Sequence, residues 1–200
     1  MTKRKLAFSV TCLCLLTALA LAAPGTAQPP EGEMPAEMAA MMEAYMKAGT
    51  PGEPHEFLAQ TVGKWKVTSK MWMGPGEPQV SEATSVREMI LNGRFLQEKF
   101  EGTVMGMPFQ GIGITGYDNV NDKYWATWMD SMTTWLTTME GERDGDTVVW
   151  HGEGPDPMTG GTAKMKMVAT NHGKDKTVVE FYEMHGGEEV RTMELTYERQ

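Results

Sequence analysis

The sequence predicts an all-β protein: an antiparallel up-and-down barrel of about ten strands, preceded by an N-terminal Met-rich helix. From Lys64 onward apolar and polar residues alternate with a period of two, the pattern of half-buried strands. Turn residues return about every ten positions, and Asn92-Gly93, Asp144-Gly145 and Gly186-Gly187 read as hairpin turns between neighbouring strands. About ten strands are more than one flat antiparallel sheet usually holds, so a barrel or a sandwich is expected. Hairpins between consecutive strands favour the closed barrel, which leaves no exposed edge.

The first 27 residues have the features of a secretory signal peptide. A basic start, "TKRK", precedes the uncharged run "LAFSVTCLCLLTALALA", and Gly25-Thr26-Ala27 offers a small-residue cleavage site before Gln28. Ala20-Leu21-Ala22 is a second candidate cleavage site, and an uncleaved N-terminal anchor is the alternative interpretation. We expect cleavage near Ala27 and an exported protein, periplasmic or secreted, with no membrane anchor afterwards.

Composition excludes several kinds of site from the mature chain. Both cysteines, Cys12 and Cys14, lie in the leader, so no disulfide, thiolate metal site or cysteine nucleophile remains after cleavage. The chain has 18 basic and 27 acidic residues, and the leader removes three of the basic ones. Nucleic acid is therefore a poor partner for this protein.

Residues 28–53 form a linker with a helix-favouring centre rich in Ala, Glu and Met. Its methionines recur at spacings of three and four, which places them along one side of a helix: Met34, Met38, Met41, Met42 and Met46. Thioethers suit Cu(I), so one interpretation is a copper site. The other is an apolar helix face that packs on the domain or a partner, and it is favoured because no His or Cys lies among these methionines.

Residues 54–200 form the barrel domain. The period-two segments are 64–73, 79–91, 94–104, 108–117, 123–131, 134–143, 146–152, 161–171, 176–185 and 188–199. Three of these segments have an unambiguous apolar face, because their large apolar residues alternate with polar ones. The apolar residues are Trp65 and Met71 in the first segment, Met165 and Met167 in the eighth, and Tyr197 in the last. Methionines on these faces suit either an adaptable ligand cavity or a packed core.

A Gly-x-Trp motif, Gly63-Lys64-Trp65, opens the first strand after the short helical segment "PHEFLAQTV". It resembles the opening of lipocalin-like (calycin) barrels, in which the Trp closes one end beneath an arginine from the last strand. Arg199 stands where that arginine would be, and a guanidinium over an indole contributes about 0.5–2 kcal/mol. The resemblance implies that Gly63, Trp65 and Arg199 close the barrel.

A longer pattern, "PGEPHEFL…VGKW…MWMGPGEP…NGRFLQEKFEG…MGMPFQGIGITGYDNVNDKY…TWMDSM…GPDPMTG", resembles the bacterial family known as "domain of unknown function 1579" over about Pro51 to Arg199. It implies a calycin-type barrel and supplies no activity to carry over. Heme-binding nitrobindin-like barrels are a more distant analogy. His151 and His185 lie on predicted strands and are weak candidates for heme or metal ligands, whereas no zinc-type histidine spacing occurs.

The best candidate site is an apolar lumen. In "YWATWMDSMTTW", Trp125 and Trp128 lie on opposite faces of one strand. We predict that Trp128 faces inward, with Asp130 near one rim of the barrel. The predicted cavity lining is Met71, Trp128, Met165, Met167 and Tyr197. The sequence thus favours a binding module for a small apolar or amphipathic ligand, with no cofactor. The alternative is a structural or interaction domain with a packed interior that docks through its Met-rich helix, and a heme-binding barrel or an enzyme ranks below both.

Overall fold

A computed structural model describes residues 35–157, 159–185 and 188–200 of the chain. The predicted signal peptide, residues 1–27, lies outside the described residues. Two helices, α1 (Ala36–Gly49) and α2 (Glu53–Ala59), precede ten strands. The strands are β1 (Gly63–Met71), β2 (Gln79–Ile90), β3 (Phe95–Val104), β4 (Met107–Asp118), β5 (Lys123–Asp130), β6 (Thr137–Asp144), β7 (Thr147–Asp156), β8 (Gly161–Asn171), β9 (Lys176–His185) and β10 (Glu188–Arg199). The predicted fold class is confirmed.

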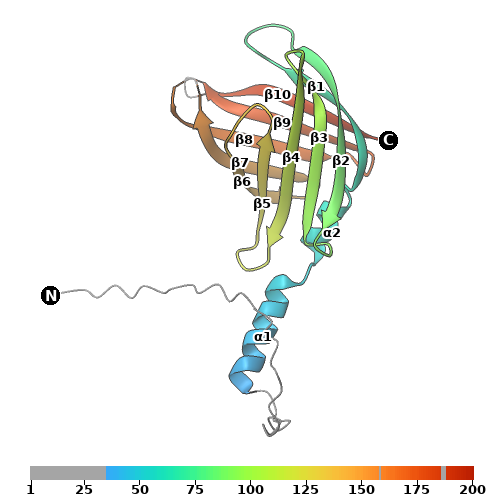
Figure 1. Cartoon of the computed structure of the whole chain (residues 1–200), viewed down its shortest axis with the longest axis vertical. Coiled ribbons are helices and arrows are strands. Elements are labelled where there is room, and N and C mark those ends of the chain that lie inside the picture. The colour runs from blue at the N-terminus through green and yellow to red at the C-terminus, as the bar shows by residue number, and fades with distance from the viewer. Residues whose placement is uncertain (1–34, 158, 186–187) are drawn as a thin grey trace, which may run out of the picture.

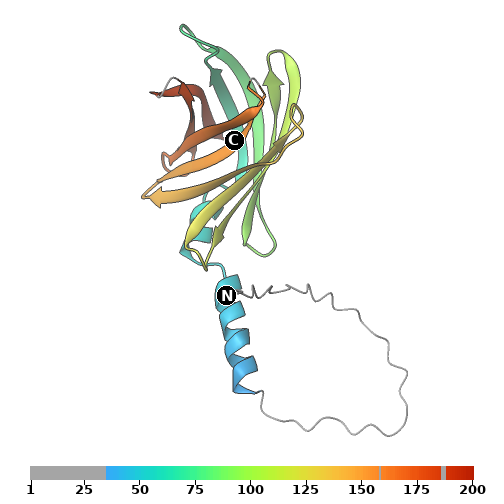
Figure 2. The same ribbon diagram turned by 90° about the vertical axis from the view of Figure 1, so that its left-hand side faces the viewer.

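The strands form a closed antiparallel barrel in which each strand pairs with its neighbours in sequence (Figures 1 and 2). Closure comes from β1 and β10, whose register runs from Trp65 opposite Arg199 to Met71 opposite Met193. Because this pairing satisfies the outer hydrogen-bonding groups of the first and last strands, the described part of the barrel leaves neither strand as an exposed sheet edge.

The sixth strand begins three residues later than the sequence pattern predicts. The carboxylate of Asp130 accepts hydrogen bonds from the backbone N–H groups of Met132 and Thr133, at 2.9 and 3.0 Å. An Asp that bonds the backbone two and three residues ahead stabilises a turn instead of a strand. The chain therefore enters β6 only at Thr137.

Helix α2 covers one end of the barrel (Figure 1). Phe57 and Leu58 from α2 pack with Leu96, Tyr124, Val148 and Trp150 in one buried cluster. The helix begins at a turn in which the Gly52 N–H donates to Nδ1 of His55 at 3.1 Å. We call this the closed end and the opposite one the open end.

Helix α1 lies beyond the closed end and buries none of its residues (Figure 1). Its apolar side chains, Met38, Met41, Met42, Tyr45 and Met46, are all exposed. The amide of Asn119 donates to the carbonyls of Ala48 and Thr50 and so ties the helix end to the β4–β5 turn. Within the described residues, neither helix is long and apolar enough to cross a membrane.

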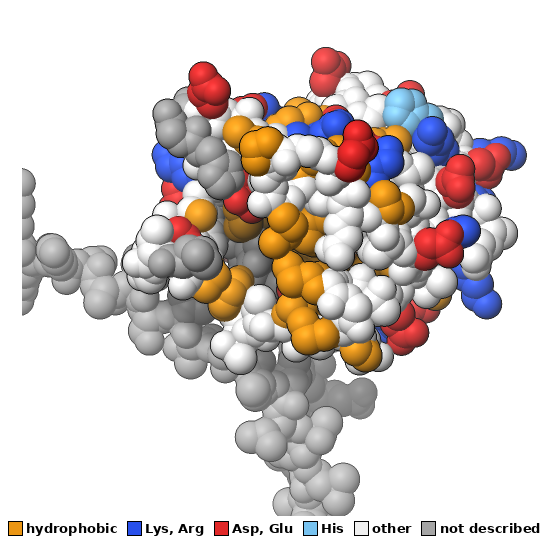
Figure 3. Space-filling model, turned by 90° about the horizontal axis from the view of Figure 1, so that it is seen from above, with side chains coloured by type: hydrophobic (Ala, Val, Ile, Leu, Met, Phe, Trp, Pro, Cys, Tyr) orange, Lys and Arg blue, Asp and Glu red, His pale blue; other side chains and the backbone are white. Residues whose placement is uncertain are grey.

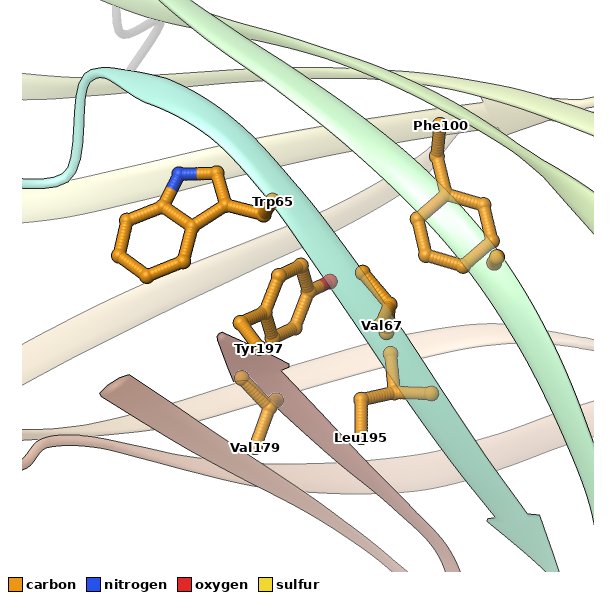
Figure 4. Close-up of a cluster of buried hydrophobic side chains, with 7 residues drawn as sticks. Trp65, Val67, Phe100, Val179, Leu195 and Tyr197 are labelled. Carbon is orange, nitrogen blue, oxygen red and sulfur yellow. The ribbon is translucent and has the colours of Figure 1, made fainter. Parts of the chain in front are cut away.

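A second buried cluster fills the barrel above the closed end. Trp65 and Val67 from β1 meet Leu195 and Tyr197 from β10, as Figure 4 shows. Val179 from the neighbouring β9 and Phe100 from β3 complete the labelled group. The period-two pattern of β1 and β10 therefore packs as predicted, with the apolar face inside.

Candidate ligand site in the barrel interior

Inward-facing side chains are much less buried at the open end than at the closed end. Leu96, Tyr124, Val148 and Trp150 beside α2 are buried, with at most 7% of their surface exposed. The inward side chains of the open half are only half-buried: Met71, Phe109, Trp128, Met165 and Met193. Seen from above, hydrophobic side chains gather around a hollow in the barrel (Figure 3). Solvent therefore reaches an apolar interior.

Aromatic rings form one wall of this interior. Trp128 lies against Phe100 and Phe109, with ring centroids 6.2 and 6.5 Å apart. The ring occupies the space above Gly111 and Gly113, where a Cβ on Gly111 would come within 2.1 Å of it. Its indole N–H donates to Asp130 at 3.1 Å, which holds the ring in place. These contacts make a rigid apolar surface next to the open end.

A polar cluster lies deeper in the barrel, on β2 and β3. The Ser85 hydroxyl donates to Glu98 Oε1 at 2.7 Å. Nη2 of Arg87 lies 3.3 Å from each oxygen of the same carboxylate. Ser85 and Arg87 are buried, and the Glu98 side chain keeps 17% of its surface exposed. An ion pair in an otherwise apolar interior costs desolvation energy, which its mutual attraction and hydrogen bonds must offset.

Two aromatic residues frame the guanidinium of Arg87. Its Cζ lies 4.2 Å from the ring centre of Tyr197 and 5.8 Å from that of Trp65. Burial opposes the charge of Arg87, yet the attraction of Glu98 and then Tyr197 outweighs it and raises the pKa of this residue. Burial, followed by the nearby negative charge of Glu98, raises the pKa of the Tyr197 phenol far above its ordinary value. The cluster therefore holds a charged pair next to a protonated phenol.

One atom of this cluster is unsatisfied. Nε of Arg87 is buried without a hydrogen-bond partner. Buried donors in native proteins are nearly always paired, and an unpaired one costs about 1–3 kcal/mol. Among the described residues, Arg87 therefore keeps one buried hydrogen-bond donor unused.

The three residues predicted to close the barrel lie together at the closed end. Cζ of Arg199 sits 4.2 Å from the ring centre of Trp65, which is itself 1% exposed. The guanidinium donates to the carbonyls of Gln60, Val62 and Lys174. It also fills the space that a side chain on Gly63 would need. Arg199 thus joins the start of β1 to the β8–β9 turn.

The structure separates the predicted lining residues into two groups. Met71, Trp128 and Met165 face the interior of the open half and are half-buried. Met167 packs against both buried clusters, and Tyr197 is buried in the cluster around Trp65. Because Tyr197 contacts Arg87, it belongs to the deep polar cluster and not to the open half. A ligand-binding role for all five remains a prediction.

The histidine candidates do not meet in the interior. His151 is exposed and points to the outer face, since its neighbour Trp150 is buried inside, so it is not placed to ligate a heme within the barrel. The side chain of His185 lies outside the described residues. Among the described residues, no group of three or more His, Cys, Asp or Glu side chains is arranged to hold a metal ion.

Sequence reasoning missed the polar cluster because the pattern of β2 is ambiguous. Ser85 and Arg87 alternate with Val86 and Glu88, so neither face of this strand reads as apolar. The available signal was on β3, where Glu98 stands between Leu96 and Phe100 on one face. A carboxylate flanked by buried apolar residues requires a partner inside the barrel.

A second concavity lies on the outer face of β5 to β8. It encloses about 690 Å³ and is lined by outward side chains that include Trp125, Glu140, His151 and Lys164. Charges of both signs line this groove, in contrast to the aromatic wall of the interior. We therefore place the candidate site inside the barrel.

The sequence profile described as "Protein of unknown function (DUF1579)" matches residues 50–199. The chain belongs to the DUF1579 family. This match spans α2 and the entire barrel and leaves out α1, so the barrel is the unit that defines a DUF1579 protein. A search of curated proteins found no match.

Two solved structures are similar to this DUF1579 barrel. Rv2717c from M. tuberculosis is 14% identical, with a TM-score of 0.54, and the match covers 75% of this chain and 99% of that one. A redesigned beta barrel is 17% identical, with a TM-score of 0.40, and the match covers 72% of this chain and 94% of that one. The likeness to Rv2717c shows a shared barrel fold.

Proposed function

We propose that this protein is a binding module that holds a small apolar or amphipathic ligand in the barrel interior. The observation that carries the proposal is the gradient of burial along the lumen, from closely packed side chains beside α2 to half-buried Met71, Phe109 and Trp128 near the open end. A barrel filled by its own side chains would bury these residues as well. An apolar recess with a few polar groups is the usual composition of a small-molecule site.

The loops around the open end support the same proposal. Each of the turns β1–β2, β3–β4 and β5–β6 exposes large apolar side chains, and the end of β9 adds one more. These residues are Met73, Met105, Met107, Met132, Leu136 and Met184, each between 48% and 71% exposed. Exposed apolar residues gathered at one place mark interaction sites, and flexible methionines adapt to varied apolar shapes.

A fluorescence titration with the neutral apolar dye N-phenyl-1-naphthylamine tests the proposal. We expect saturable binding, with energy transfer from tryptophan to the bound dye. Trp128→Ala removes a ring from the lumen and should weaken binding by about tenfold or more. Trp125→Ala, on the outer face of the same strand, is the matched control and should bind as the parent does. Absence of saturable binding, or equal loss in both variants, would refute the proposal; circular dichroism checks that both variants fold.

We also propose that the protein is exported, because residues 1–27 combine a basic start, an apolar run and a small-residue cleavage site. Expression of the full chain in its own host, followed by cell fractionation and N-terminal sequencing, tests this. Export with cleavage predicts a mature form that begins near Gln28. A full-length chain in the cytosolic fraction would refute it. Native mass spectrometry of the same material would reveal a bound ligand by its added mass.

One observation favours a second candidate, an interaction domain that docks through α1. The helix buries no residue and exposes a face that includes Met38, Met41, Met42 and Tyr45. A lone 14-residue helix is marginal in water, so a covering partner would stabilise it. Met41→Gln with Met42→Gln should then abolish a complex purified from the host and leave dye binding unchanged. A complex that survives both substitutions would exclude docking through this face.

A further inference from the structure

The two charges of the deep polar cluster compensate each other. Arg87 and Glu98 form an ion pair between neighbouring strands, and Ser85 supplies a further neutral donor to the carboxylate. The site that a ligand meets in the lumen is therefore polar but carries no net charge. A ligand with a charged head group would disturb this balance, because it would add an uncompensated charge in a poorly solvated interior.

The cluster nevertheless has unused hydrogen-bonding capacity of both kinds. A carboxylate offers about four lone-pair sites, and Glu98 accepts a short hydrogen bond only from Ser85, because Arg87 reaches its two oxygens through one nitrogen at 3.3 Å and the Tyr197 phenol interacts with the same carboxylate. The Glu98 side chain keeps 17% exposure, so this acceptor is within reach from the lumen. Nε of Arg87 is a donor without a partner, although the side chain is more than nine-tenths buried. A ligand group that both donates and accepts would satisfy the two together.

The mouth of the barrel adds negative charge. Asp130, Asp156 and Glu183 occupy inward register positions near the ends of β5, β7 and β9. The whole chain has a formal net charge of −9. An anionic ligand would therefore pass the carboxylate of Asp130 before it reached Glu98, in a chain whose own net charge is negative.

We propose that the lumen selects neutral amphipathic ligands with a hydroxyl or primary amide head, and binds that head at Glu98 and Arg87. The hydroxyl or amide N–H donates to Glu98, while its oxygen accepts from Arg87. The apolar tail lies against the wall formed by Phe100, Phe109 and Trp128. This inference rests on the proposed ligand-binding function and adds the chemical class of the ligand.

Competition with N-phenyl-1-naphthylamine at neutral pH tests this, with four ligands of one chain length: 1-dodecanol, dodecanamide, dodecanoate and dodecylamine. We expect the alcohol and the amide to displace the dye at concentrations about tenfold lower than the carboxylate or the amine. Saturable dye binding with equal displacement by all four, or tighter binding of either ion, would overturn the inference and leave the proposed function intact. Failure of the dye itself to bind would instead count against the proposed function.

Two variants sharpen the test. Glu98→Gln removes the negative charge and leaves Arg87 uncompensated, so the preference should reverse toward dodecanoate by about tenfold or more. If Glu98→Gln fails to fold, the double variant Arg87→Met with Glu98→Leu replaces the pair by apolar groups of similar size. This double variant should still bind the dye but lose the tenfold difference between the alcohol and the carboxylate. If either variant keeps the original preference for the alcohol over the carboxylate, the Arg87–Glu98 pair does not select the head group.

Discussion

Replacing Gly63 by alanine should release Arg199 from the closed end of the barrel. Gly63 has a φ of 144°, and a Cβ built on it would lie 2.4 Å from Nη1 of Arg199. Two heavy atoms cannot stay at that distance, so the guanidinium must leave its place over Trp65. The methyl group thus removes the contacts of a residue 136 positions away in sequence, and the closing seam between β1 and β10 loses an anchor.

The size of the effect follows from those contacts. Displacement of Arg199 removes the stack on Trp65, worth about 0.5–2 kcal/mol, and three hydrogen bonds to carbonyls. Because the Arg199 side chain keeps 24% of its surface exposed, water replaces part of this loss. Arg199→Ala should therefore cost about 2–3 kcal/mol of unfolding free energy. Gly63→Ala should cost about 1 kcal/mol more, since alanine is also strained at this backbone conformation.

A double-mutant cycle separates displacement from strain. When Arg199 is already alanine, Gly63→Ala should cost only the backbone strain. The double variant should therefore lose about 2 kcal/mol less unfolding free energy than the sum of the two single variants. Urea unfolding followed by tryptophan fluorescence measures each free energy, because Trp65 is buried.

Gly93→Ala provides the matched control for this cycle. Gly93 also has a positive φ, 80°, but a Cβ there meets nothing within 4 Å. The loss of unfolding free energy in Gly93→Ala should therefore add to the loss in Arg199→Ala. If Gly63→Ala and Arg199→Ala are also additive to within about 0.5 kcal/mol, Arg199 is not displaced and the reasoning fails.

Three further predictions concern other parts of the molecule. Gly111→Ala should cost about 1–3 kcal/mol of unfolding free energy in a urea titration, because the new methyl group clashes with the ring of Trp128; an unchanged midpoint would contradict this. Burial and then the charge of Arg94 lower the pKa of His55, so the folded protein should be fully stabilised above the unfolded-state pKa near 6.5 and lose stability as the pH falls below it, by at most about 1.4 kcal/mol per pH unit. Unfolding of His55→Asn across this range should show a flatter dependence on pH, and equal slopes would exclude His55 as the source. Deletion of residues 1–47, which keeps the two carbonyls that Asn119 bonds, should change the free energy of unfolding by less than about 0.5 kcal/mol, since α1 buries no residue, and a larger loss would reveal packing of α1 on the barrel.

Much of the interior could be predicted where a strand has one apolar and one charged face. The lysines that alternate with Met165 and Met167 identify the outer side of β8 without knowledge of its neighbours. Trp128 was harder, because Trp125 on the same strand has the opposite parity. The prediction that Trp128 faces inward is confirmed by its packing on the buried cluster around Trp65, while Trp125 contacts Phe95 on the outer face.

The deep polar cluster lay beyond such reasoning because it depends on pairing between strands. Arg87 meets Glu98 only because the β2–β3 hairpin sets these two residues opposite each other. A shift of that register by one residue would turn Glu98 to the outside and leave Arg87 without its counter-ion. The outward position of His151 is simpler, since it follows from the buried position of its neighbour Trp150.

The amino-acid sequence alone determined the number of strands, their order around the barrel and the inner face of the clearly alternating strands. It did so because alternation has a period of two and hairpin turns join neighbours, and both are local properties of the chain. The tertiary structure decided which end of the barrel is open, that Arg199 lies over Trp65, and that Arg87 and Glu98 share the interior. These features depend on how strands are staggered around a closed barrel and on which end α2 covers, and both arise from contacts between residues far apart in sequence.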